Sequence, residues 1–163
     1  NGKNYGFHPD LQDMTLGEYI DVDTFIGDWS NIHTAMNVLY RPIKQRTGGK
    51  YLIEDYNPDT KEQMTGMPLE AVISSVFFFI SFRDEFVSNR YESLFSGGTG
   101  ETTSVAAGFG QKWGWFGSVY ELAQGDITRF EDITKLNIHE CFTMLSFIKE
   151  KQEAETQQIK NKK

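Results

Sequence analysis

The sequence predicts an all-α protein, a small domain of about five to six helices around a central apolar helix, with minimal β structure. Three observations lead to this prediction. Apolar residues recur at steps of three and four in several segments, which is the spacing of one helix face. Capping residues and prolines stand where these segments begin or end. The segment at residues 69–95 is apolar on all sides in its middle, so we expect other helices or a partner chain to enclose it.

Two helices are expected near the start of the chain. Thr15 and Glu18 have the spacing of a capping box, in which each side chain accepts a hydrogen bond from a backbone N–H at the helix start. A second helix is expected after Asp28. It should end near Tyr40, because Pro42 disfavours helical geometry in the residue before it. Its apolar stripe consists of Ile32, Ala35, Met36, Leu39, Tyr40 and Ile43.

The central helix follows a turn. Gly48 and Gly49 predict that turn, and residues 51–53 are expected to form a brief extended segment. Pro68 then opens the central helix, predicted over residues 69–95. One side of this helix is formed by Leu69, Ile73, Val76, Ile80, Val87, Tyr91 and Leu94.

A glycine-rich stretch separates the two halves of the chain. Residues 96–110 contain five glycines, which is typical of a flexible linker. The sequence therefore predicts an N-terminal helical part at 1–95, a Gly-rich linker at 96–110 and a C-terminal helical part at 111–163, which together form one composite domain. The C-terminal part carries two apolar helix faces, formed by Trp113, Phe116, Val119, Tyr120 and Ala123, and by Ile138, Cys141, Phe142, Leu145 and Ile148.

Charge and hydropathy exclude two classes of partner. The 163 residues include 16 Lys and Arg against 23 Asp and Glu, a formal net charge of −7, so we expect no binding to nucleic acid or to anionic lipid. The longest apolar tract, at residues 71–82, is shorter than the roughly 20 residues that a membrane-spanning helix needs. No basic stretch followed by an apolar run opens the chain, and we expect no signal peptide.

Residues that carry catalytic or metal chemistry are sparse. The single cysteine, Cys141, and three scattered histidines give no cluster for a metal ion. The glycines at residues 97–102 resemble a phosphate loop, but Glu101 stands where that loop needs a lysine. His139 and Cys141 lie two positions apart, which places them on different faces of a helix. We therefore expect no enzymatic activity, no metal and no cofactor.

The aromatic content, 14% of the residues, favours a binding protein. Trp, Tyr and Arg are the residues most enriched among interface hot spots. Core packing is the alternative for each aromatic residue, since large aromatic side chains are mostly buried. An arginine beside a proline at a helix end pairs with a carboxylate or a helix carbonyl, either inside the protein or across an interface. The candidate protein-interaction residues are Trp29, Tyr40, Arg41, Phe109, Trp113 and Trp115.

Two runs of the sequence resemble proteins of tailed bacteriophages. They are residues 29–43, in which Trp29 is followed by MNVLYRPI, and residues 113–147, which contain WGWF, LAQGDIT and ITKL. The resemblance is to tail assembly chaperones and related tail-morphogenesis proteins. It implies a mostly helical, non-enzymatic protein in the host cytoplasm during assembly, where it binds apolar segments of tape-measure or tail tube proteins.

Two alternatives stay open. The first is a structural virion component, such as a neck, connector, baseplate or internal protein, which is retained in the virion. For both the chaperone and this alternative, the expected partners are other phage structural proteins (tape-measure, tail tube or neck proteins), and a homo-oligomer remains open. The second is an enzyme or nucleotide-dependent regulator, which a thermal shift with nucleotides or divalent metals would detect, because a ligand that prefers the folded state stabilises it.

Overall fold

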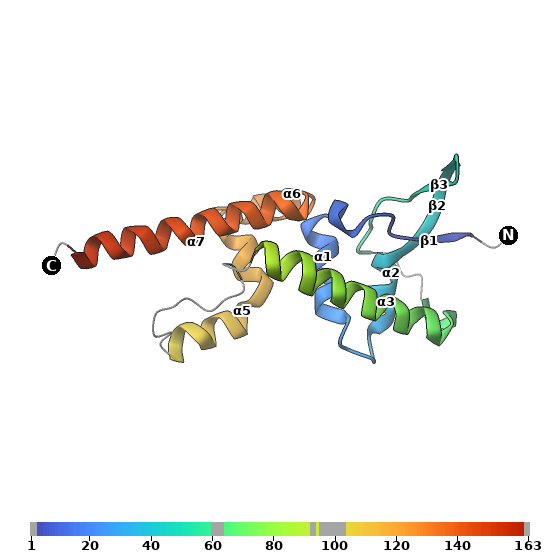
Figure 1. Cartoon of the computed structure of the whole chain (residues 1–163), viewed down its shortest axis with the longest axis horizontal. Helices are drawn as coiled ribbons and strands as arrows, with labels where there is room; N and C mark the ends of the chain where they lie inside the picture. Colours follow the sequence, from blue (N-terminus) through green and yellow to red (C-terminus); the bar gives the residue numbers. More distant parts are fainter. Residues whose placement is uncertain (1–2, 60–63, 92–93, 95–103, 162–163) are drawn as a thin grey trace. The chain divides into compact units, whose positions relative to one another are not determined.

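The computed structural model describes residues 3–59, 64–91, 94 and 104–161 (Figure 1). The chain divides into two compact units, Asn1–Phe82 and Arg83–Lys163. Within the described residues there are six α-helices and a three-stranded antiparallel sheet. The prediction of an all-α domain with minimal β structure is therefore wrong, although most of the described chain is helical.

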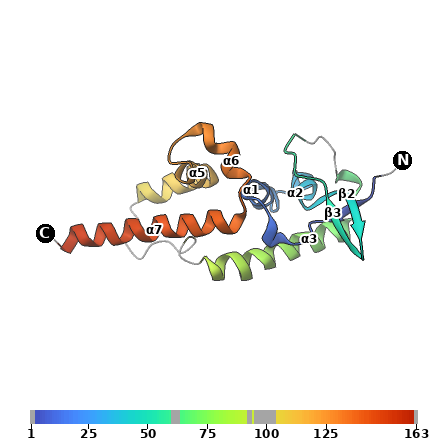
Figure 2. The same ribbon diagram turned by 90° about the horizontal axis from the view of Figure 1, so that it is seen from above.

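The first unit contains the whole sheet and three of the α-helices. Its strands are β1 (Tyr5–Phe7), β2 (Tyr40–Thr47) and β3 (Lys50–Ile53), in the spatial order β1-β2-β3. Its α-helices are α1 (Leu16–Phe25), α2 (Ile32–Leu39) and α3 (Leu69–Phe82), and two short 3-10 helices are η1 (Leu11–Asp13) and η2 (Met64–Gly66). Helices α1 and α2 lie side by side (Figure 2).

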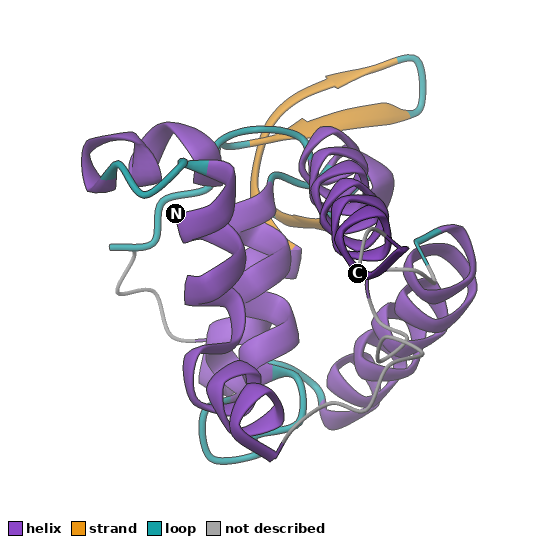
Figure 3. Ribbon diagram, turned by 90° about the vertical axis from the view of Figure 1, so that its left-hand side faces the viewer, coloured by secondary structure: helices purple, strands orange, loops and turns teal. Residues whose placement is uncertain are grey.

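The sheet arises where helix α2 cannot continue. Helix α2 ends at Leu39, and Tyr40 already has extended backbone, as the position of Pro42 predicted. The chain then pairs with β1, with Tyr5 opposite Pro42. It turns back through Gly48 and Gly49, both at positive φ, into β3 (Figure 3). The sequence predicted the turn and an extended 51–53. The strand 40–47 was missed because its polar side chains show no apolar alternation.

The side chain of Tyr51 connects β3 to β1. The ring of Tyr51 lies directly over Gly6, where an added Cβ would stand 2.5 Å from a ring carbon. The Tyr51 hydroxyl donates a hydrogen bond to the carbonyl of Phe7 at 2.8 Å. Glycine at position 6 is thus required by space, because any other side chain would displace this ring.

The core of the first unit lies where α1, α2 and α3 meet. Tyr19 of α1 and Phe79 of α3 are fully buried, with their ring centroids 5.7 Å apart. The predicted apolar stripe of α2 is confirmed for its central residues. The buried members of the helices are Leu16, Tyr19 and Val22 of α1, Ala35, Met36, Val38 and Leu39 of α2, and Val72, Val76 and Phe79 of α3.

The central helix differs from its prediction in length and in burial. Helix α3 ends at Phe82, and a π-helical turn, η3 (Arg83–Ser88), follows it. One face of α3 is buried, but the described residues of the chain do not enclose the opposite face, on which Phe77 and Phe78 are exposed. Helix α3 therefore carries more large apolar side chains than are buried within the first unit.

The second unit is helical throughout its described residues. Helix α5 (Ser104–Leu122) contains a kink at Gly114, whose φ of 44° is open to glycine. The short helices η4 (Ile127–Arg129) and α6 (Phe130–Thr134) follow, and then α7 (Ile138–Asn161). Of the predicted linker at 96–110, residues 96–103 lie outside the described residues and 104–110 belong to α5. The predicted division into parts at 1–95, 96–110 and 111–163 stays a prediction.

The core of the second unit is formed by α5, α6 and α7. Trp115 stacks on Phe142 with the ring planes 8° apart, and Tyr91 meets the same ring edge-on at a centroid distance of 5.4 Å. Cys141 is buried, and burial raises the pKa of its thiol to about 11. The prediction that Cys141 belongs to the apolar face of its helix is confirmed.

We predict that Gly6→Ala lowers the free energy of unfolding by about 1–3 kcal/mol, because the new methyl group displaces Tyr51 from its packing and its hydrogen bond. Gly27→Ala is the matched control, since an added Cβ there meets no atom within 4 Å. Urea denaturation of both variants is the measurement. Equal stability of the two variants would contradict the close approach of Tyr51 and Gly6.

Candidate functional site

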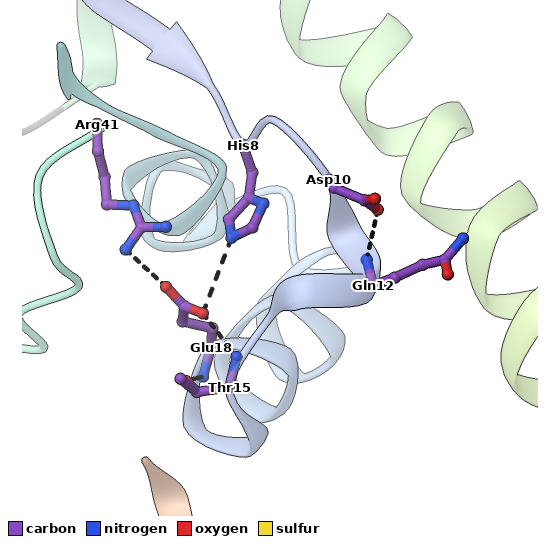
Figure 4. Close-up of polar contacts among 6 residues, drawn as sticks. All are labelled: His8, Asp10, Gln12, Thr15, Glu18 and Arg41. Carbon is purple, nitrogen blue, oxygen red and sulfur yellow. Dashed lines mark hydrogen bonds and ion pairs between the residues drawn. The ribbon is translucent and has the colours of Figure 1, made fainter. Parts of the chain in front are cut away.

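Three ionisable side chains meet inside the first unit (Figure 4). His8, Glu18 and Arg41 expose only 7%, 4% and 7% of their surface. Charged side chains are almost never buried so fully unless they are paired. This group, which we call the buried polar cluster, is therefore the first candidate for a functional site.

Local structure places each member of the cluster. Thr15 and Glu18 form the predicted capping box, in which Thr15 Oγ1 accepts from the Glu18 N–H at 3.2 Å and Glu18 Oε2 accepts from the Thr15 N–H at 2.7 Å. Gly6 pairs with Arg41 across the sheet, and the His8 N–H donates to the Leu39 carbonyl. Because side chains alternate along a strand, His8 and Arg41 lie on the same face of the sheet, toward Glu18.

Glu18 uses both carboxylate oxygens. Oε1 lies 2.6 Å from Nη1 of Arg41, and Oε2, besides the Thr15 N–H, lies 3.9 Å from Nε2 of His8. The carboxylate therefore joins the start of α1 to β2 and to the residue that follows β1. A second link is near it, where the Tyr56 hydroxyl donates to Asp21 of α1.

His8 is held in its neutral form. Burial lowers the pKa of its imidazole below the ordinary value of 6.5, and the charge of Arg41 lowers it further, against the opposing effect of Glu18. Nε of Arg41 has no hydrogen-bond partner among the described residues. The cluster thus contains a buried polar atom whose hydrogen-bonding capacity is unused.

The cluster lies between two hollows of the first unit. His8 lines an open groove of about 680 Å³, between the segment that follows β1 and the β2–β3 hairpin. Arg41 lines a smaller, mainly polar pocket of about 150 Å³, together with Asn37, Tyr40 and residues 54–57. Side chains of the buried polar cluster thus reach two different surfaces of the unit.

The geometry of the cluster is suited to holding structure. Arg41 and Glu18 neutralise each other, and both carboxylate oxygens already accept N–H groups, so Glu18 is not poised as a general base. The part of the chain that the structure describes holds no group of three or more His, Cys, Asp or Glu side chains that could bind a metal ion. We therefore treat the cluster as a structural element that shapes the surfaces beside it.

The predicted interaction residues of the first unit have different environments. Trp29 lies in the turn between α1 and α2 and is exposed. Tyr40 is half-buried, with its hydroxyl 3.0 Å from Ser75 Oγ and its ring edge-on to Phe7. Arg41 is buried in its pair with Glu18, so of the two alternatives for this arginine the internal one holds. Tyr40 and Arg41 are adjacent but contribute to opposite faces of the sheet.

The predicted residues of the second unit lie around the kink of α5. Trp113 is exposed, with Nζ of Lys112 5.1 Å from the centroid of its ring. Trp115 is half-buried in its stack on Phe142. The side chain of Phe109 lies outside the described residues. The kink at Gly114 therefore separates an exposed tryptophan from one that packs on the core.

The sequence reasoning missed an exposed apolar surface on α3. Leu69, Ile73 and Phe77 follow one another at steps of four and expose 65%, 37% and 67% of their surface. We call these three residues the α3 stripe. The apolar middle of this helix was the available signal, from which we expected enclosure by other helices or by a partner chain, without naming these residues as interaction residues. A second missed group lies on α5, where Phe116 and Tyr120 are exposed beside Trp113.

Comparisons with known proteins give no relative from which a function could be transferred. No family model, no curated protein and no solved structure was found to match this chain. Among the described residues, no helix is both long and apolar enough to cross a membrane.

We predict that Arg41→Ala destabilises the protein by about 3–5 kcal/mol, because it leaves the buried carboxylate of Glu18 without its counter-charge. Urea denaturation measures the loss. Lys135→Ala, which breaks the solvent-exposed pair with Glu131, is the matched control and should leave the midpoint unchanged. A similar loss of stability in both variants would show that the buried ion pair contributes no more to stability than the exposed one.

We also predict that stability falls on acidification partly through His8. Its pKa is lowered in the folded state, so the unfolded chain takes up the proton first, and the contribution of neutral His8 is present above pH 6.5 and lost below it. Between about pH 7.5 and about pH 5.5, the urea midpoint should therefore fall more in the wild type than in His8→Gln. Parallel decreases in the two proteins would refute this role.

Proposed function

We propose that this chain is a non-enzymatic assembly protein that binds other proteins through exposed apolar side chains, as a bacteriophage tail assembly chaperone does. The partners we propose are apolar segments of tape-measure or tail tube proteins, bound in the host cytoplasm during assembly. The observation that supports this proposal is the α3 stripe. It consists of large apolar side chains on a regular helix whose opposite face is already buried.

The spacing of the stripe suits recognition of a partner segment. Residues at steps of three and four on a helix form one row, and such rows are the anchors by which helices dock against apolar surfaces. On the other side of α3, Val72, Val76 and Phe79 are packed in the core. The stripe is therefore presented by a helix whose position is set independently of any partner, which limits the entropy lost on binding.

The energy available is of the right order for a reversible chaperone. Covering one large apolar side chain contributes roughly 1.5–3 kcal/mol. Three such side chains together contribute at most about 4.5–9 kcal/mol, which is comparable with the cost of association of roughly 4–15 kcal/mol. A complex held by the α3 stripe alone would be weak, and this suits a protein that must release its client when the client assembles.

A structural virion component is the second candidate, and the second unit supplies the observation that favours it. Trp113, Phe116 and Tyr120 form an exposed aromatic group on α5, distinct from the α3 stripe. A subunit built into a ring or lattice contacts more than one neighbour and so requires more than one surface. Mass spectrometry of purified particles separates the candidates, since a chaperone is missing from mature virions and a structural subunit is present at fixed copy number.

We predict that Ile73→Asp combined with Phe77→Asp weakens capture of co-expressed tape-measure and tail tube proteins by about tenfold or more, because a desolvated carboxylate replaces each apolar contact. The control is Gln157→Asp combined with Gln158→Asp, which adds the same charge at exposed positions of another helix, α7. Capture is measured by pull-down, and circular dichroism confirms that both variants fold.

Capture that both double variants retain equally would remove the α3 stripe from the interface. Capture of neither phage protein by the wild-type chain would refute the chaperone proposal itself. If the chain is instead found in purified particles, the structural virion component replaces the chaperone as the proposed function.

A further inference from the structure

The β2–β3 hairpin is a basic element in an acidic chain. No acidic residue stands between Asp28 and Glu54, although the chain as a whole contains 23 Asp and Glu against 16 Lys and Arg. We call residues 44–52 the basic hairpin, and its turn stands clear of the three α-helices of the first unit (Figure 1). Its exposed cations are Lys44, Arg46 and Lys50.

These three cations form no ion pair with a carboxylate in the part of the chain that the structure describes. Lys135 of the second unit, by contrast, pairs with Glu131 at 2.6 Å. Asp10 and Asp13 line the groove beside the hairpin together with Lys50, but neither of them contacts its ammonium group as an ion pair. The basic hairpin therefore carries positive charge that no described carboxylate neutralises by direct contact.

The strand register fixes where two of the cations stand. Beside the turn of two glycines, Thr47 pairs with Lys50 and Arg46 pairs with Tyr51. Paired residues share a face of the hairpin and successive residues alternate between faces, so Arg46 and Lys50 point to opposite faces. A negatively charged group that reaches the turn from either face therefore meets a cation.

The guanidinium group of Arg46 is positioned before any partner binds. Its Cζ lies 5.9 Å from the centroid of the Tyr51 ring, and the Tyr51 hydroxyl donates to the carbonyl of Phe7. A guanidinium group that lies over an aromatic ring keeps its N–H groups available for a carboxylate. Because the side chain is already held, less conformational entropy is lost when a carboxylate binds to it.

An exposed apolar side chain accompanies this charge and favours a polypeptide as the partner. Leu52 exposes 61% of its surface and shares the face of Lys50. A polypeptide can cover it with an apolar side chain, which a phosphate backbone lacks. A nucleic acid would also extend its charge beyond the hairpin, where the excess of acidic residues in this chain repels it.

We propose that the basic hairpin is a docking site for an acidic segment of another protein, whose carboxylates pair with the three cations and whose apolar side chain covers Leu52. Complementary charge supplies the recognition, since a basic segment would be repelled at the same place. Exposed ion pairs each contribute little, so the contact is reversible and sensitive to salt. The site is distinct from the α3 stripe, and its test does not depend on the proposed function.

Two synthetic peptides test the charge of the partner. In one, glutamate residues flank a central leucine, and in the other, glutamine replaces each glutamate. NMR titration of the isotope-labelled full chain measures the affinity and identifies the amides that respond. We expect the glutamate peptide to bind at least about tenfold more tightly than the glutamine peptide and to shift the amides of residues 44–52. Its binding should weaken as the salt concentration is raised.

Arg46→Gln combined with Lys50→Gln removes two of the three cations, and we expect about tenfold weaker binding of the glutamate peptide. Lys151→Gln combined with Lys160→Gln is the matched control, because it removes the same charge at exposed positions of α7 and should bind as the wild type does. Lys50→Gln alone leaves Arg46 over Tyr51 and should weaken binding about threefold, which keeps the test decisive if the double variant does not fold.

Three outcomes would overturn the proposal. One is that neither peptide binds, or that both bind equally. Another is that the hairpin variants and the α7 control bind the glutamate peptide alike, or that the responding amides lie outside residues 44–52. The last is a DNA oligonucleotide that binds more tightly than the glutamate peptide and loses its binding in the hairpin double variant, since this would place a nucleic acid on the basic hairpin.

Discussion

The carboxylate of Glu18 is the contact on which the arrangement of the first unit depends. It closes the capping box of α1 with Thr15 and at the same time neutralises Arg41 of β2 at 2.6 Å. Burying a charge pair is costly in itself, and here the cost is limited because each carboxylate oxygen accepts an N–H group. A helix start, a strand and the residue after β1 are thereby held at one point.

The pair of Glu18 and Arg41 also determines which way the neighbouring side chains of β2 point. With Arg41 directed to Glu18, Tyr40 is directed to the other face of the sheet, where it meets Ser75 of α3 and the ring of Phe7. Helix α3 is thus held by one face, and the α3 stripe remains outward. On the Glu18 side, His8, Asp10 and Asp13 line the groove beside the β2–β3 hairpin. One buried ion pair thus lies between the sheet and the start of α1.

Local signals in the sequence predicted two ends of helices correctly. Thr15 and Glu18 form the capping box of α1, and Pro42 stops α2. These features depend on residues within a few positions of one another. The sheet was missed for the converse reason, since β1 and β2 are 35 residues apart from Tyr5 to Tyr40 and neither shows an apolar alternation. Of the candidate interaction residues, Trp29 and Trp113 are exposed, Trp115 packs on Phe142, and Arg41 is internal.

By itself, the sequence determined where α1 begins and where α2 stops, that the middle of α3 is apolar on every side, and that acidic residues exceed basic ones. It did not determine which side of α3 would be covered or where Arg41 would find its carboxylate. Only the tertiary structure decided these, because an apolar side chain is buried or exposed according to what packs against it. Likewise, an arginine pairs with the carboxylate that the fold brings within contact distance of its guanidinium group, as Glu18 is for Arg41.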